Sequence, residues 1–264
     1  MPSSAALRQQ IEHDFENRYP AILTPSRRTI REVASTGIPA IDELLDGGLP
    51  VGAISELTGP ISSGRTTIAL SFVAQQTRSG SVCAWVDAAD SLDPESAAAN
   101  GISLKHLLWV RCENTSAEKT FNSGQRRPNS KSQPWTRLDK AIRATDLLLQ
   151  AGGFSSIVLD LGNENVEHGR RIPLATWFRF RQAADRTRCS LIVVGKAPFA
   201  QSSAAVVLEC QPARLESDSG TVVRGISYRV QRRRERFSPI TAITRKPPVS
   251  TWSAAANWND ERRA

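Results

Sequence analysis

The sequence lacks the features that indicate a membrane span, a disulfide framework or a zinc site. It has no run of about 18 apolar residues, and its first fifteen residues are too polar for the core of a signal peptide. Its four cysteines lie more than twenty residues apart, and none of its three histidines has a second one at ligand spacing. We therefore expect a cytoplasmic protein with no membrane contact, with buried, reduced thiols and without zinc chemistry.

The length and composition fit one α/β domain with irregular ends. The chain has 264 residues, of which 40% are hydrophobic and 23% are charged, values that are ordinary for a globular protein. The formal net charge is +8, and it is concentrated in one place: residues 224–246 hold eight basic residues and one acidic residue. A focused positive charge favours an anionic partner such as a nucleotide or a nucleic acid.

Short apolar runs alternate with amphipathic segments along most of the chain. Strands are expected at residues 53–57, 82–87, 107–111, 155–161, 189–195, 204–210, 225–231 and 240–244. Helices are expected at residues 4–16, 38–45, 68–78, 138–149 and 174–184. Strands that are apolar throughout and alternate with helices are typical of a parallel sheet covered on both faces. The pattern predicts an α/β fold with a mostly parallel, twisted sheet.

The same pattern divides the chain into a core and two flanking segments. Residues 1–34 are predicted to form an N-terminal helix and a proline-punctuated linker, and residues 35–246 the core. Within the core, residues 113–135 are polar and without periodicity, which predicts a flexible surface insertion. Residues 247–264 are expected to be a loose tail.

The strongest motif is GPISSGRTT, at residues 59–67, between an expected strand and an expected helix. Glycines at such a junction let successive backbone amides converge on one point, to which the following helix adds its positive N-terminal end. The motif predicts a P-loop that binds a nucleoside triphosphate, with ATP expected. The expected contacts are Gly59, Ser62, Ser63, Gly64, Arg65, Thr66 and Thr67. The alternative is a capped strand–helix turn without a ligand.

Mg²⁺ would accompany the triphosphate. The Thr66 hydroxyl is expected to be a ligand, and Asp160, at the end of an apolar strand, would hold the metal through water. Asp87, at the end of another strand, is a further candidate. Where a P-loop usually has lysine, the chain has Arg65, whose wide planar guanidinium replaces a compact ammonium.

Two further stretches support a resemblance. ELTGPISSGRTTIAL and VCAWVDAADSLDPESAAANGISLKHLLWVRC resemble the core of the bacterial RecA recombinase, and the likeness extends over roughly residues 35–246. STGIPAIDELLDGGLPVGAISEL, the P-loop arginine and TWFRFRQAA are closer to the RecA-related ImuA and SulA-like accessory proteins. The resemblance implies a RecA-like P-loop NTPase core and a role in DNA repair.

The departures from the recombinase pattern concern catalysis and DNA binding. The glutamate that orients the attacking water in a recombinase is replaced by Ala89, and Asp90 is a weak substitute because it is shifted by one residue. Lys196 stands at the position of the switch glutamine, and about eight residues follow it where a recombinase has a long DNA-binding loop. We therefore expect weak or no hydrolysis of ATP, and we identify no confident catalytic residue.

The basic run QRRRERF has three interpretations. Arg232 and Arg234 would share one face of a strand, and by resemblance they match positions that reach a neighbouring subunit's triphosphate. Together with Arg233 and Arg236 they could instead contact the phosphates of DNA. The third interpretation is a solvated, charged edge strand that discourages aggregation.

The sequence is therefore compatible with three functional hypotheses. The first is a RecA-like ATP-binding accessory factor for damage-induced (SOS) translesion synthesis, and the ImuA resemblance implies an ImuB-like partner and a DnaE-type polymerase. The second is a divergent recombinase, a DNA-dependent ATPase that forms filaments on single-stranded DNA. The second requires a homo-oligomer, and a vestigial P-loop in a non-catalytic interaction module is a third alternative.

Overall fold

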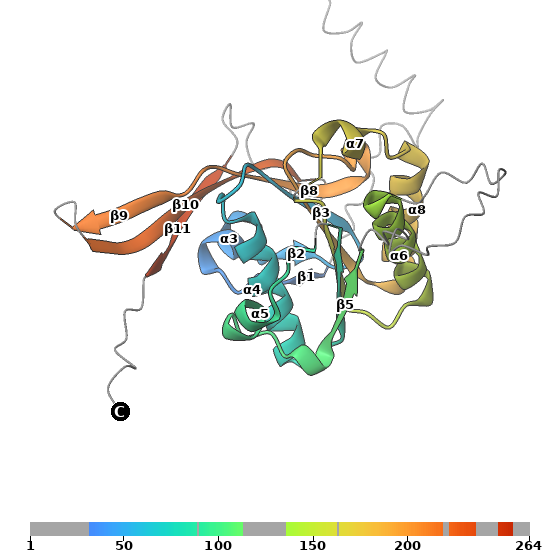
Figure 1. The fold of residues 1–264 in the computed structure, drawn as a ribbon, viewed down its shortest axis with the longest axis horizontal. Coiled ribbons are helices and arrows are strands. Elements are labelled where there is room, and N and C mark those ends of the chain that lie inside the picture. Colours follow the sequence, from blue (N-terminus) through green and yellow to red (C-terminus); the bar gives the residue numbers. More distant parts are fainter. Residues whose placement is uncertain are drawn as a thin grey trace, which may run out of the picture.

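The computed structural model describes residues 32–88, 90–112, 136–162, 164–218, 222–235 and 248–255 (Figure 1). The helix expected at residues 4–16, the insertion expected at 113–135 and the strand expected at 240–244 lie outside these ranges.

The core of the described chain is one large sheet with the strand order β11-β10-β8-β3-β7-β6-β4-β5, in which β9 also pairs with β10. The strands are β3 (Ile54–Thr58), β4 (Cys83–Asp87), β5 (Leu107–Arg111), β6 (Ser156–Asp160), β7 (Ser190–Gly195), β8 (Ala204–Cys210), β9 (Arg214–Asp218), β10 (Val222–Glu235) and β11 (Val249–Ala255). All pairs from β8 to β5 are parallel, whereas β10 is antiparallel to β8, β9 and β11. The predicted α/β fold with a mostly parallel sheet is confirmed.

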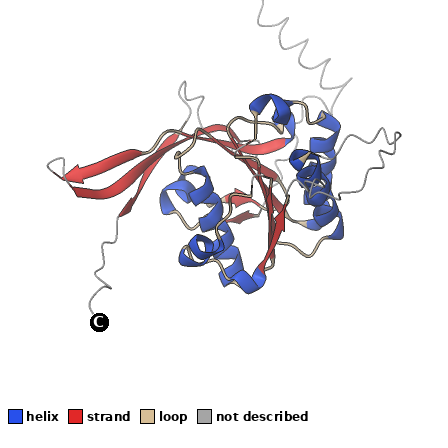
Figure 2. Cartoon of the chain, in the orientation of Figure 1, coloured by secondary structure: helices blue, strands red, loops and turns tan. Residues whose placement is uncertain are grey.

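Helices lie on both faces of the parallel strands (Figures 1 and 2). They are α3 (Pro39–Leu44), α4 (Arg65–Arg78), α5 (Pro94–Ala99), α6 (Arg137–Ala151), α7 (Val166–Arg170) and α8 (Leu174–Thr187). One buried apolar cluster joins the sheet to α3 and α4, and a second joins it to α6 and α8. The short strands β1 (Val33–Ala34) and β2 (Leu49–Pro50) form a separate antiparallel pair.

The sequence explains why these elements form where they do. Every residue of β3, β4, β6 and β7 is buried, as expected for parallel strands covered on both faces. Helix α6 begins with a capping box, in which Thr136 and Asp139 each accept a hydrogen bond from the other's backbone amide. Helix α5 begins at Pro94, and the preceding Asp93 accepts hydrogen bonds from two amides of the first turn.

The C-terminal part differs from the expected loose tail. Residues 249–255 form β11, which pairs with β10 from Gly225 to Gln231. Strands β9, β10 and β11 form a ribbon that extends beyond the helices (Figure 1). Trp252 of β11 stacks on Tyr228 of β10, with ring centroids 4.3 Å apart. Backbone pairing and this aromatic contact order a segment whose polar composition gave no strand signal.

The structure also bears on the cysteines and on the question of a membrane span. The four cysteines, Cys83, Cys112, Cys189 and Cys210, are all buried and free, and burial raises the pKa of the Cys189 and Cys210 thiols to about 12. The predicted burial of Cys83, Cys189 and Cys210 is confirmed. Within the described ranges, no helix combines the length and the apolar character that crossing a bilayer requires.

A pair of neighbouring aromatic residues on α8 tests the packing of the sheet against this helix. Trp177 is 0% exposed and makes an edge-to-face contact with Phe180, whereas Phe178 is 47% exposed, with the Arg181 guanidinium over its ring. We expect Trp177→Ala to lower the free energy of unfolding by about 3–5 kcal/mol, because it leaves a cavity in the core.

The control is Phe178→Ala, for which we expect a loss of about 1 kcal/mol or less, the value of an exposed cation–π contact. Urea denaturation measures both values. Equal losses for the two variants would contradict the packing described here.

Candidate nucleotide-binding site

The loop between β3 and α4 adopts a backbone conformation that depends on its glycines. Gly59, Ser62 and Gly64 have φ values of 153°, 59° and 83°, in the left-handed half of conformational space. A Cβ atom on Gly59 would lie 2.3 Å from the carbonyl oxygen of Cys210, and one on Gly64 would lie 2.6 Å from the ring of Tyr228. Only glycine therefore fits at these two positions, which are the first and last of the loop.

The backbone amides at the start of α4 have no acceptor within the described chain. The first bond to a loop carbonyl runs from Ile68 N–H to Gly64 O at 3.0 Å, and no described residue accepts a hydrogen bond from the amides of Ser63 to Thr67. The hydroxyl of Ser63 is also buried and lacks a partner among the described residues. Unpaired donors at a helix N-terminus form an anion site, so this cradle fits the phosphates of a nucleotide.

The Arg65 side chain does not extend into the open end of this cradle. It is 6% exposed, and its Nη1 donates to the carbonyl oxygens of Gly59 and of Gly195, the latter at 3.2 Å. Its Nη2 donates to the carbonyl oxygen of Gly162 at 2.8 Å. Burial lowers the pKa of Arg65, and the charge of Asp160 opposes that effect. The guanidinium thus lies beneath the loop, between the ends of β3, β6 and β7.

Asp160 lies at the end of β6, where the sequence predicted it. The residue is 4% exposed, and its Oδ1 accepts a 2.8 Å hydrogen bond from the Gly162 amide. Burial raises the pKa of Asp160 from 3.8 to about 6, and the neighbouring Asp87 adds to the rise. The Gly162 amide and the Arg65 charge act in the opposite direction. Part of the Asp160 population therefore carries a proton near neutral pH.

The other two acidic candidates have partners in the turn that follows β4 or at the end of β5. Asp87 is buried and accepts hydrogen bonds from the amides of Ser91 and Leu92, at 3.0 and 2.8 Å. Asp90 accepts two hydrogen bonds from the Arg111 guanidinium, at 2.6 and 2.8 Å, and this contact lowers the pKa of Asp90. Ala89 lies outside the described residues. The two carboxylates therefore stabilise the turn.

The residues present fit a metal only together with phosphates. Thr66 is exposed at the start of α4, and its hydroxyl and the Asp160 carboxylate are the oxygen atoms that would hold Mg²⁺. Asp87 fits poorly because its carboxylate oxygens bind backbone amides. The described residues contain no group of three or more histidine, cysteine or acidic side chains that could bind a metal by themselves. Such a site needs phosphate oxygens to complete the coordination shell.

Glu56, which was not among the predicted site residues, is buried in the middle of β3. Its Oε1 accepts hydrogen bonds from the amides of Phe199 and Ala200, at 2.6 and 2.8 Å. These amides belong to the short connection between β7 and β8, where the Phe199 ring packs against Gly169 and Gly195. The one feature of the sequence that could have indicated Glu56 is the presence of an acidic residue inside the strand-like run AISELT. Glu56 thus fixes the short connection between β7 and β8.

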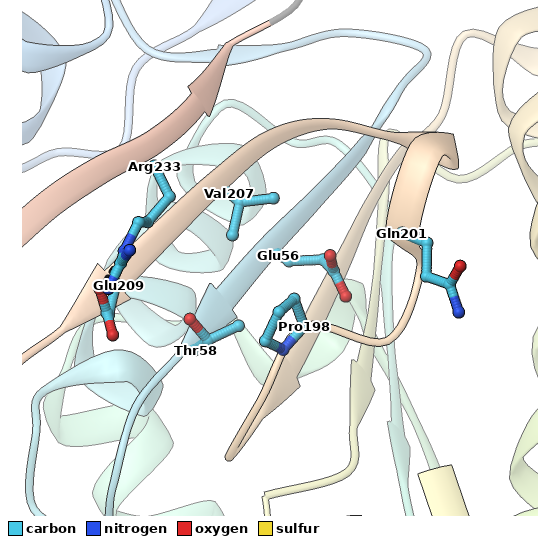
Figure 3. Close-up of a pocket in the computed structure, with 7 residues that line it drawn as sticks. All are labelled: Glu56, Thr58, Pro198, Gln201, Val207, Glu209 and Arg233. Carbon is cyan, nitrogen blue, oxygen red and sulfur yellow. Dashed lines mark hydrogen bonds and ion pairs between the residues drawn. The ribbon is translucent and has the colours of Figure 1, made fainter. Parts of the chain in front are cut away.

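A pocket of about 470 Å³ lies beside Glu56 (Figure 3). Its lining comes from β3, β8, β10 and the β7–β8 connection: Glu56, Thr58, Pro198, Gln201, Val207, Glu209 and Arg233. At one side of the pocket Arg233 forms an ion pair with Glu209. None of the residues 59–67 lines this pocket, so it is separate from the phosphate cradle.

The structure describes the basic run in part. Arg232 is paired with Asp46 at 3.4 Å, and its side chain is 18% exposed. A bulge between Arg232 and Arg234 shifts the pairing of β10 with β8, which interrupts the alternation on which their shared face was predicted. The Arg234 side chain and Arg236 lie outside the described residues.

Comparison with known proteins agrees with this architecture. The RecA N-terminal domain family model matches residues 3–122. RecA of Ruegeria pomeroyi is 31% identical over 180 residues, which is 62% of this chain and 45% of that protein. RecA of Crocosphaera subtropica is 42% identical over 99 residues, 38% of this chain and 28% of that protein. The chain thus spans less than half the length of these curated relatives.

A solved structure of the RadB recombinase shares the fold. Its TM-score is 0.55 at 17% sequence identity, and the match covers 83% of this chain and 94% of that one. The fold and the loop together define a RecA-like α/β core with a P-loop between β3 and α4. The predicted RecA-like core is confirmed, and the finer resemblance to ImuA stays a prediction.

A pair of glycines tests the geometry of the loop. Gly64 and Gly80 have nearly the same φ, 83° and 81°, but a Cβ on Gly80 meets nothing within 4 Å. We expect Gly80→Ala to cost about 1–2 kcal/mol of stability through backbone strain alone. Gly64→Ala should cost about 1–3 kcal/mol more, because the new methyl displaces Tyr228. Urea denaturation of both variants measures the difference, and equal losses would show that Tyr228 does not cover the loop.

The raised pKa of Asp160 predicts a pH dependence. Because the folded-state pKa lies above that of the unfolded chain, the folded state binds this proton more tightly. The resulting stability is present below about pH 4 and is lost as the pH rises through about 6. Asp160→Asn removes the titration and keeps an oxygen acceptor for the Gly162 amide.

We expect Asp160→Asn to gain stability relative to the unmodified protein by about 2 kcal/mol between pH 4.5 and pH 7. Urea denaturation at both pH values measures this change. A constant difference between the two proteins would mean that Asp160 has an ordinary pKa.

Proposed function

We propose that this chain is a RecA-like ATP-binding protein of DNA repair, which acts in the bacterial cytoplasm as an accessory factor for damage-induced (SOS) translesion synthesis. One observation carries the proposal: the amides at the start of α4 have no acceptor within the described chain, while Asp87 and Asp90 bind other groups. Such a site can hold a nucleotide without a carboxylate to activate water.

The nucleotide would bind through the amides of Ser63 to Thr67. These donors and the positive end of α4 would hold the phosphates, and the buried Ser63 hydroxyl would find an acceptor there. The Thr66 hydroxyl and Asp160 would hold Mg²⁺, which neutralises phosphate charge when bound. The match to the RecA N-terminal domain family spans the P-loop, which supports ATP as the nucleotide.

Weak or absent hydrolysis follows from the groups around the turn after β4. A general base must lie within hydrogen-bond reach of the attacking water. Ala89 has no acidic group, and Asp90 is paired with Arg111 through two short hydrogen bonds. Asp90 would have to leave that ion pair before it could act as a base. The site therefore favours binding of a nucleotide without its hydrolysis.

The accessory role is supported by the short, fixed connection between β7 and β8. Glu56 binds two of its amides, and Phe199 is buried against two glycines, so this segment is not free to extend along DNA. The resemblance to ImuA adds the expected partners, an ImuB-like protein and a DnaE-type polymerase. In this proposal the protein acts through contacts with those partners.

The second candidate is a divergent recombinase that assembles on single-stranded DNA as a homo-oligomer. It is favoured by the similarity to RecA and to a protein described as the RadB recombinase. In that case Arg232, Arg233, Arg234 and Arg236 would contact DNA phosphates or the nucleotide of a neighbouring subunit. Arg232 and Arg233 would first have to leave Asp46 and Glu209.

Calorimetric titration with ATP and Mg²⁺, with and without single-stranded DNA, tests the proposal. We expect binding of ATP, and we expect Thr66→Ala to weaken it about tenfold because a metal ligand is lost. Ser79→Ala, at the far end of α4, is the control and should bind like the unmodified protein.

Turnover is measured in the same samples. We expect little release of phosphate and no stimulation by DNA. DNA-stimulated turnover of about 1 s⁻¹ or faster, in the usual range of enzymes, together with ATP-dependent filaments, would favour the recombinase. Failure to bind ATP at millimolar concentration would leave only a non-catalytic interaction module.

A further inference from the structure

The Arg65 guanidinium joins three segments that are far apart in the sequence. Its donors reach the carbonyl oxygens of Gly59 at the start of the P-loop, Gly162 after β6 and Gly195 at the end of β7. Gly59 also donates its own amide to Gly195 O at 3.1 Å. The side chain thus occupies the centre of the edge formed by the carboxyl ends of β3, β6 and β7.

The space around the guanidinium is matched to its shape. A Cβ atom on Gly162 would lie 3.0 Å from Nη2 of Arg65 and 2.9 Å from Oδ1 of Asp160. The lack of a side chain at 162 is therefore what allows the guanidinium and the carboxylate to lie side by side.

Arginine suits this position better than lysine. A guanidinium has five N–H donors in a fixed plane and can bind acceptors on opposite sides, whereas an ammonium is a compact group on a flexible stem. Three carbonyls on three elements, with a carboxylate nearby, match the planar group. Moving Arg65 to a phosphate would leave those carbonyls without their donor and Asp160 without its positive neighbour.

We propose that Arg65 is a positioning residue that clamps the P-loop to the ends of β6 and β7 and does not contact a terminal phosphate, so that the site binds nucleoside diphosphates and triphosphates with similar affinity. This inference rests on the proposed nucleotide binding. The backbone amides of Ser63 to Thr67 provide the phosphate contacts. A protein with similar affinities for both would keep a bound nucleotide when ADP replaces ATP in solution.

Competition with a fluorescent nucleotide measures the affinities for ATP and ADP in the presence of Mg²⁺. A charge-assisted hydrogen bond to the terminal phosphate would separate the two by about tenfold or more. We expect the unmodified protein to bind them within about threefold of each other. A preference for ATP of tenfold or more would overturn the inference and would leave the proposed function intact.

Arg65→Lys tests the clamp itself. It should lower the melting temperature of the nucleotide-free protein by about 3 °C or more, because hydrogen bonds to buried carbonyls are lost. The released ammonium can reach a phosphate, so the variant should gain a preference for ATP over ADP. A purely structural role would lower the melting temperature and leave the ratio of affinities unchanged, which would overturn the specificity part of the inference.

Arg186→Lys, an exposed position in the last turn of α8, is the matched control and should change neither value. An unchanged melting temperature for Arg65→Lys would overturn the clamp. Should Arg65→Lys fail to fold, the clamp is supported and the ratio for the unmodified protein decides the rest. Failure of the unmodified protein to bind either nucleotide would remove the proposed function, and the melting temperatures would still test the clamp.

Discussion

The candidate site depends on a backbone turn that only glycine permits at its two ends. Gly59 and Gly64 allow the chain to leave β3, pass beside Cys210 and Tyr228, and enter α4 with its first amides unpaired. Any side chain at these two positions would collide with neighbouring atoms. The unpaired amides and the positive end of the helix follow from this turn, and donors in this arrangement favour an anionic ligand.

The charged groups around the loop have partners within the described chain. Arg65 lies under the loop, bound to carbonyls, and its charge partly compensates that of Asp160. Asp87 and Asp90 support the turn after β4. In the proposed function, such a site holds a nucleotide without a carboxylate that is free to activate water.

Much of the fold could be predicted from the sequence, because parallel strands that are buried on both faces leave continuous apolar runs. The strands at 107–111 and 204–210 were predicted to the residue, and the glycine-containing loop after Thr58 lies between a strand and a helix, as predicted. The inward turn of Arg65 could not be predicted, since its three acceptors are distant in the sequence. Strand β11 was not predicted either, because it forms by pairing with β10, a segment that is also distant in the sequence.

Hydrogen exchange at the backbone amides of Ser63 to Thr67 is the most direct measurement of the phosphate cradle. We expect these amides to exchange rapidly in the nucleotide-free protein and to become protected when ATP or ADP is added. Unchanged exchange at these amides in the presence of saturating nucleotide, with protection elsewhere in the chain, would contradict the proposed mode of binding.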